Sequence, residues 1–137
     1  MDNGVRDLMA KGDDIAARVV AFAVAVLDLC DKLPKTPQGT HIAGQLLRSG
    51  TSCAPNYGEA RAAESLSDFI HKLGIVLKEL NESRVWLEMI QKRAYIQSEI
   101  VTPALDECIA LSKIIAVSRR TAAENAGRIR QGSSTKK

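Results

Sequence analysis

Large apolar residues recur every three or four positions over most of the chain, which is the spacing of one face of an α-helix. The clearest series comprises Ile15, Val19, Phe22, Val26, Leu29 and Leu33. A second long series comprises Leu66, Phe69, Leu73, Val76, Leu80, Leu87 and Ile90. Beside the second series runs another apolar stripe of Ile70, Leu77 and Trp86, so this segment must be covered on more than one side. The pattern predicts a helical bundle organised around residues 68–90.

Prolines and capping residues divide the pattern into four predicted helices. Pro34 ends the first, because the residue before a proline resists the helical conformation. Thr36–Pro37 starts the second, with threonine as the N-cap and proline in the first turn. Residues 54–64 are predicted to continue that helix past Pro55 with a kink, and the alternative is a loop. Ser65 is the expected N-cap of the third helix, in which Gly74 indicates a close approach by another helix.

We therefore predict one all-α domain, an up-down-up-down antiparallel four-helix bundle over residues 13–124. Its fourth helix starts at Ser98 or at Thr102–Pro103 and carries an apolar face that includes Val117. Residues 1–12 are polar without a helical period and are expected to be flexible. The period fades after Ala123, so residues 125–137 are expected to form a disordered basic tail.

Charge is distributed unevenly along the 137 residues. The chain carries a formal net charge of +3, yet residues 113–137 alone hold seven basic residues against one acidic residue, or +6. The remaining part holds 12 basic and 15 acidic residues, or −3. A basic terminal segment favours contact with a polyanion, and the competing interpretation is a solubilising end.

Cysteine usage and hydropathy bear on the cellular setting. The three cysteines, Cys30, Cys53 and Cys108, lack the C-x-x-C spacing of a zinc or redox site and lie in apolar helical contexts, which predicts buried free thiols in a reducing cytoplasm. The apolar run Val19–Leu27 is far too short to cross a membrane. We expect a cytoplasmic protein without a membrane partner.

No pattern for catalysis stands out. Bundles that hold two irons use Glu-x-x-His pairs from two helices, whereas this chain offers only Asp68 with His71. Ser49, Ser52 and Cys53 have no paired base at a telling distance, and no glycine-rich loop follows a strand. We predict no enzyme activity, no metal and no cofactor.

A row of polar residues lies close to the inner face of the second predicted helix. Its members are Arg48, Ser49, Ser52, Asn56 and Glu59. Polar groups near a core need partners, and Lys72, Glu79 and Glu82 of the third helix could supply them. One interpretation is a structural network that fixes how two helices or two subunits meet. The other is a site for a ligand or nucleic acid.

Three blocks of the chain resemble a bacterial four-helix-bundle family named for proteins encoded in intervening sequences of 23S ribosomal RNA genes. The blocks are Leu33–Ser52, Asn56–Ala60 and Asp68–Ile90, within a resemblance that covers roughly residues 15–120. The matching family positions are Arg48, Ser49, Ser52, Asn56, Glu59, Lys72, Glu79 and Trp86. The accessory variability determinant of diversity-generating retroelements is similar. It is a homopentameric barrel that associates with a reverse transcriptase and nucleic acid.

The resemblance implies a homo-oligomeric, pentameric barrel. Together with the basic terminal segment, it implies a non-catalytic accessory module that engages nucleic acid or a nucleoprotein such as a reverse transcriptase. RNA is favoured over DNA as the ligand. The candidate phosphate contacts are Arg48, Arg61, Lys72, Arg119, Arg120, Arg128 and Arg130. The alternative is a protein-only scaffold or regulatory oligomer that binds no nucleic acid.

Overall fold

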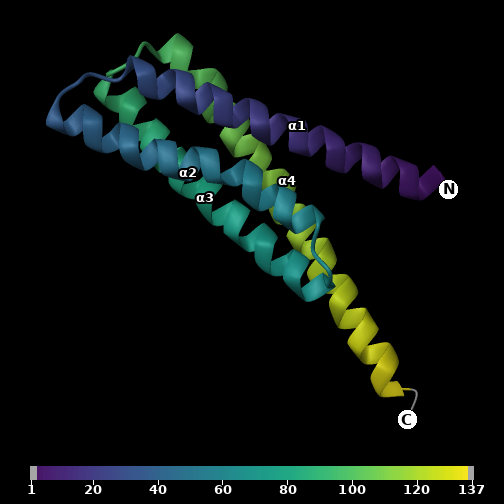
Figure 1. Ribbon diagram of the computed structural model, residues 1–137. Helices are drawn as coiled ribbons and strands as arrows, with labels where there is room; N and C mark the ends of the chain where they lie inside the picture. The colour runs from purple at the N-terminus through teal and green to yellow at the C-terminus, as the bar shows by residue number, and fades with distance from the viewer. Residues whose placement is uncertain (1–2, 136–137) are drawn as a thin grey trace.

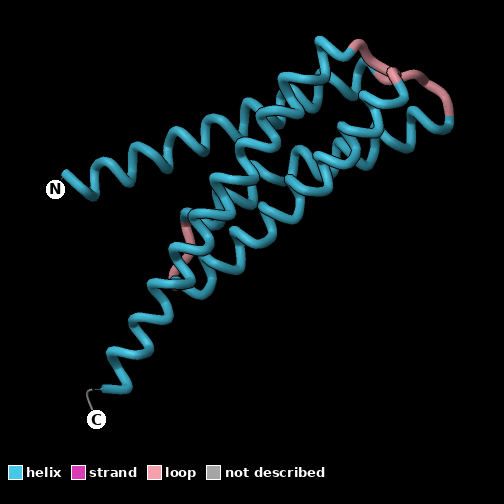
Figure 2. Tube along the Cα trace, turned by 180° about the vertical axis from the view of Figure 1, so that it is seen from behind, coloured by secondary structure: helices cyan, strands magenta, loops and turns pink. Residues whose placement is uncertain are grey.

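The computed structural model describes residues 3–135, and this range folds into four α-helices joined by short loops (Figure 1). The helices are α1 (Asn3–Lys32), α2 (Pro37–Arg61), α3 (Leu66–Arg93) and α4 (Ser98–Thr135). Figure 2 shows the same arrangement from behind, with no strand in the described range. Helices adjacent in sequence pack side by side, α1 and α4 contact each other less, and the pairs α1/α3 and α2/α4 make no close backbone contact within the described residues. The predicted all-α, four-helix architecture is confirmed.

The core forms along the apolar series that the sequence defines. The first apolar series is fully buried from Val19 on α1 through Leu33, the residue that follows α1, and Ile15 at its start is half-buried. On α3, the apolar residues with no exposed surface are Leu73, Val76, Leu80, Leu87 and Ile90. Burial of these side chains supplies the main favourable free energy of folding. The third helix is therefore the central element of the bundle, packed against both α2 and α4.

Local capping explains where α2 and α3 begin. The Thr36 hydroxyl accepts a hydrogen bond from the backbone N–H of Gly39 at 3.1 Å, and the Ser65 hydroxyl accepts one from the N–H of Asp68 at 3.0 Å. Each bond satisfies a first-turn amide that has no helical partner. Helix α2 runs continuously through Pro55, whose side chain is exposed. The fourth helix begins at Ser98, the earlier of the two predicted starts.

Helices α1 and α4 extend further than the sequence pattern predicted. Residues 3–12, expected to be flexible, belong to α1, and residues 125–135, expected to be disordered, belong to α4. The apolar period marks only the part of a helix that packs on the core. Backbone hydrogen bonds continue the helix beyond that part without an apolar face. Residues 1–2 and 136–137 of the two predicted terminal segments lie outside the described residues.

Two glycines are explained by close packing. A Cβ atom at Gly50 of α2 would lie 2.7 Å from a methyl carbon of Val26, a fully buried residue of α1, so the two helices meet at this point. A Cβ atom at Gly74 of α3 would lie 3.2 Å from the guanidinium of Arg119. The sequence predicted that another helix approaches Gly74 closely. The group that contacts this position is the side chain of Arg119 from α4.

The cysteines give a chemical test of the packing. Cys53 and Cys108 are fully buried, and burial raises the pKa of each thiol from 9.0 to about 12. The thiolate is the reactive form, so at pH 8 we expect Ellman's reagent to modify only half-buried Cys30 in the native protein. Cys53 and Cys108 should react after unfolding in urea. Rapid native reaction of all three thiols would contradict the packing of α2, α3 and α4 described here.

Candidate functional site

The N-terminal part of α1 and the C-terminal part of α4 diverge, as Figures 1 and 2 show. The space between them is a groove of about 1180 Å³ with a floor formed by the end of α2 and the start of α3. Its apolar lining comes from all four helices and comprises Met9, Ile15, Tyr57, Ala60, Leu66, Phe69, Ile114, Val117 and Ala122. Val117, which the sequence assigned to the core face of the fourth helix, is 52% exposed in this groove. We refer to this feature as the α1–α4 groove.

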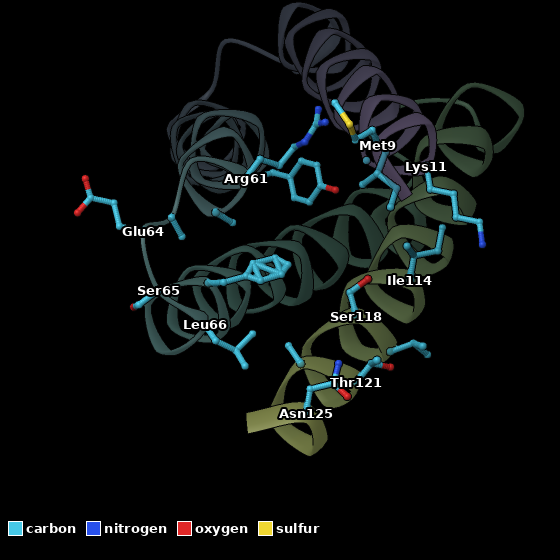
Figure 3. Close-up of a pocket in the computed structure, with 18 of the residues that line it drawn as sticks. Met9, Lys11, Arg61, Glu64, Ser65, Leu66, Ile114, Ser118, Thr121 and Asn125 are labelled. Atoms are coloured by element: carbon cyan, nitrogen blue, oxygen red, sulfur yellow. The ribbon is translucent and has the colours of Figure 1, made fainter. Parts of the chain in front are cut away.

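Charged residues of the α1–α4 groove lie at its edges. In Figure 3 the charged ends of Lys11 and Glu64 point away from the cavity, whereas Met9 and Ile114 line it. The Arg61 guanidinium forms an ion pair with Asp13 at 2.7 Å and lies against Gly12. Apolar side chains at helical spacing with charges at the rim suit an amphipathic helix better than a small polar ligand.

The polar row on α2 meets α3 through ion pairs. Arg48 donates a hydrogen bond to Glu79 at 3.2 Å and also contacts the carboxylate of Glu82. About three turns further along α2, Glu59 accepts a hydrogen bond from Lys72 at 3.0 Å, and this bond raises the pKa of Lys72. Such exposed ion pairs stabilise a fold only weakly. They nevertheless mean that Arg48 and Lys72 are already bound to carboxylates of the protein itself.

A buried hydroxyl pair lies beneath these ion pairs. The hydroxyl oxygens of Ser49 on α2 and Ser83 on α3 are 2.9 Å apart, and both residues have no exposed surface. Ser52 and Asn56 bond instead to backbone carbonyls of α2 itself. Ser83 is not among the site residues predicted from the sequence. The signal that could have found it is a small polar residue at a position that continues the apolar face of α3.

The seven candidate phosphate contacts separate into two groups. Arg48, Lys72 and Arg61 are held by carboxylates, and Arg119 donates a hydrogen bond to the Ile70 carbonyl at 3.3 Å. The second group consists of Arg120, Arg128 and Arg130. The side chains of these three are exposed and make no hydrogen bond or ion pair within the described residues. Only the second group is free to meet a ligand without breaking an existing contact.

The free arginines lie on the part of α4 that projects beyond the other helices, which we call the C-terminal arm (residues 120–135) (Figure 1). Lys113, Arg120 and Arg128 follow one another at separations of seven and eight residues, so they return to nearly the same side of the helix. Glu124 is the one acidic residue in the arm. The arrangement is a cationic helix face accessible along its length.

Trp86 of α3 is half-buried, and its indole ring meets His41 of α2 edge to face with ring centroids 6.0 Å apart. The indole N–H is buried without a hydrogen-bond partner among the described residues. Within residues 3–135, no cluster of three or more histidine, cysteine, aspartate or glutamate side chains could hold a metal ion. No helix in that range is long and apolar enough to span a membrane.

Comparison with known proteins adds a family and a solved relative. Residues 13–117 match the 23S rRNA-intervening sequence protein family. A crystal structure of a protein of unknown function from the S23 ribosomal protein family of Bacteroides thetaiotaomicron VPI-5482 is 33% identical in sequence. It superposes with a TM-score of 0.74 over 80% of this chain and 98% of that chain. None of the curated proteins matches.

Proposed function

The chain belongs to the 23S rRNA-intervening sequence protein family, and on that premise we propose that it is a non-catalytic, homo-oligomeric module that binds nucleic acid through the C-terminal arm. The observation that carries the proposal is the exposure of Arg120, Arg128 and Arg130 without an internal partner. Phosphate contacts by arginine supply most of the non-specific affinity for nucleic acid. The ribosomal RNA in the family's name favours RNA as the ligand.

The fold restricts how such a ligand would be held. The arm offers point contacts and bidentate guanidinium contacts to phosphates, and it has no aromatic residue on which bases could stack. We therefore infer recognition of the backbone of a structured RNA rather than of its base sequence. A nucleoprotein partner, including a complex with a reverse transcriptase in the cytoplasm, would be engaged through the same phosphate contacts.

Removal of two arm cations tests the proposal. We expect Arg120→Gln/Arg128→Gln to reduce the dependence of log K on log salt by about 1.4–1.8, because each phosphate contact contributes about 0.7–0.9 to that slope. The measurement is fluorescence anisotropy with a structured RNA and a DNA duplex over a salt series, using the full chain.

The matched control is Lys78→Gln/Lys92→Gln, which removes the same charge from exposed positions on α3. This control should leave the salt slope unchanged. Equal losses in the two double variants would show that net charge, and not the arm, governs binding. Absence of binding by the unmodified protein at low salt would remove nucleic acid as the ligand.

The α1–α4 groove favours a second candidate function, a protein-only scaffold or regulator. Its wall on α4 presents Ile114, Val117, Ser118 and Thr121 on adjoining sides of the helix, and Met9 and Ile15 face them from α1. An amphipathic helix of a protein partner would bury these side chains and fill the α1–α4 groove. In that case, Val117→Glu would abolish capture of the partner while leaving the RNA salt slope intact.

A further inference from the structure

Tyr57 of α2 ends in a hydroxyl group that makes no hydrogen bond within the described residues. The residue belongs to the lining of the α1–α4 groove and is only 6% exposed. Among the described residues, the indole N–H of Trp86 is the one fully enclosed side-chain polar atom without a partner, so the Tyr57 hydroxyl still opens into the groove. Polar groups placed this deeply are normally hydrogen-bonded. The hydroxyl therefore offers a hydrogen bond to an occupant of the groove.

A second donor lies beside this hydroxyl. Arg61 follows Tyr57 by four residues, one turn further on the same side of α2. Its guanidinium donates from Nη2 to Asp13 at 2.7 Å, and its other nitrogens donate to no acceptor within the described residues. Burial raises the pKa of Tyr57, the charge of Arg61 lowers it and that of Asp13 raises it, so the phenol is a neutral donor near the guanidinium. These two donors suit one carboxylate.

The charges around the groove also favour an anion. Its lining includes three basic residues, Lys11, Arg61 and Lys113, and one acidic residue, Glu64. Lys11 and Lys113 belong to the opposite walls formed by α1 and α4, and neither makes an ion pair within the described residues. Lys11 and Glu64 point outwards in Figure 3, so they act on a ligand at the mouth of the groove. The excess of basic groups would attract a negatively charged ligand.

The remaining lining suits an alkyl chain. On α4 it extends from Lys113 to Asn125, roughly 18 Å of helix. Phe69 of α3 and Val117 of α4 contribute apolar surface along this length. The groove of about 1180 Å³ is slightly larger than typical small-molecule sites, which measure roughly 300–1,000 Å³. A mostly apolar lining with a few convergent polar groups is the usual composition of such sites.

We propose that the α1–α4 groove binds a fatty acid, whose carboxylate is held by the Tyr57 hydroxyl and the Arg61 guanidinium. The alkyl chain lies along α4 and is covered by Phe69 and Val117. A partner helix in the same groove would place apolar side chains against the Tyr57 hydroxyl and leave it without a hydrogen bond, which is unfavourable. The fatty acid is therefore the better fit. This inference goes beyond the proposed binding of nucleic acid, which uses the C-terminal arm.

Isothermal titration calorimetry of the full chain with laurate tests the carboxylate contact. Laurate should bind at least tenfold more tightly than dodecyltrimethylammonium, which has the same alkyl chain and the opposite charge. Tyr57→Phe removes only the hydroxyl and should weaken laurate binding about tenfold, the lower end of what a hydrogen bond to a charged group contributes. The matched control is Tyr95→Phe, which removes the hydroxyl of the second tyrosine, outside the groove, and should leave the affinity unchanged.

Two further variants separate the carboxylate contact from the chain contact. Arg61→Gln should narrow the difference in affinity between laurate and dodecyltrimethylammonium. Val117→Glu places a charge at a 52% exposed position of the groove and should abolish binding of both compounds. Its matched control is Val85→Glu at a 47% exposed position of α3 outside the groove. In the unmodified protein, decanoate should bind more weakly than laurate by up to about fourfold for each methylene removed.

The opposite results overturn the proposal. No saturable binding of laurate below its micelle concentration means that the groove does not hold a fatty acid. Equal affinities for laurate and dodecyltrimethylammonium mean that no carboxylate is recognised. Equal affinities of Tyr57→Phe and Tyr95→Phe mean that laurate binds elsewhere, and this comparison decides the matter if Val117→Glu fails to fold. The RNA salt slope of the arm variants is a separate readout, so either proposal can fail alone.

Discussion

Leu73→Ala is expected to lower the free energy of unfolding by about 2–5 kcal/mol, because the shortened side chain leaves a cavity that the neighbouring helices cannot fill. Leu73 has no exposed surface and lies on the helix that packs against both α2 and α4. Domains of this size have a free energy of unfolding of only about 5–15 kcal/mol, so the variant would lose a large fraction of its stability. A urea titration should show a lower midpoint with an unchanged slope.

Val85→Ala is the comparison for this cavity. Val85 lies on the same helix but is 47% exposed, and its truncation should change the free energy of unfolding by less than about 0.5 kcal/mol. Similar urea midpoints for the two variants would mean that the central face of α3 is not where the structure places it.

Gly50→Ala is expected to destabilise the protein by about 2 kcal/mol even though alanine is the better helix former. The new methyl group would lie 2.7 and 2.8 Å from the two γ-carbons of Val26, which is fully buried and cannot turn aside. Helix α1 would have to move away from α2. The double variant Val26→Ala/Gly50→Ala should recover part of the loss, so the two substitutions should be less harmful together than their sum.

Gly44→Ala on the same helix should have the opposite sign. Nothing lies within 4 Å of the added Cβ atom, so the substitution should stabilise dilute, monomeric protein by up to about 1 kcal/mol. Both variants are compared by urea unfolding at the same low concentration. If Gly50→Ala is as stable as Gly44→Ala, the close contact between α1 and α2 is wrong.

The sequence pattern predicted the elements that depend on a single rule. The series Val19–Leu33 predicts one buried face because a helix that packs on a core repeats its apolar residues at the helical period. Thr36 and Ser65 predict two helix starts because their hydroxyls can cap first-turn amides, and both do. The structural effect of these residues depends only on neighbours within the same helix, so it can be predicted without knowing how the other helices pack.

Features that depend on two distant residues were harder to predict. Ser83 forms its hydroxyl pair only because α3 brings it to Ser49, 34 residues earlier in the chain. Arg119 was assigned to phosphate contact, yet the absence of a side chain at Gly74 lets it reach the Ile70 carbonyl. Periodicity identifies which side of a helix is apolar, but it does not state which neighbour a polar residue on the border will meet.

The projecting arm of α4 has a consequence for local unfolding. Beyond Ala122 the side chains of α4 are mostly exposed, so its last turns resemble an isolated helix, and isolated helices of this length are marginal in water. Amide hydrogen exchange should therefore be slow in the part of α4 that carries Leu111 and Ile115 and become progressively faster towards residue 135. A polyanion held by the arm would slow exchange in these last turns while the amides of the core keep their rates. The arm would then be ordered by what it binds.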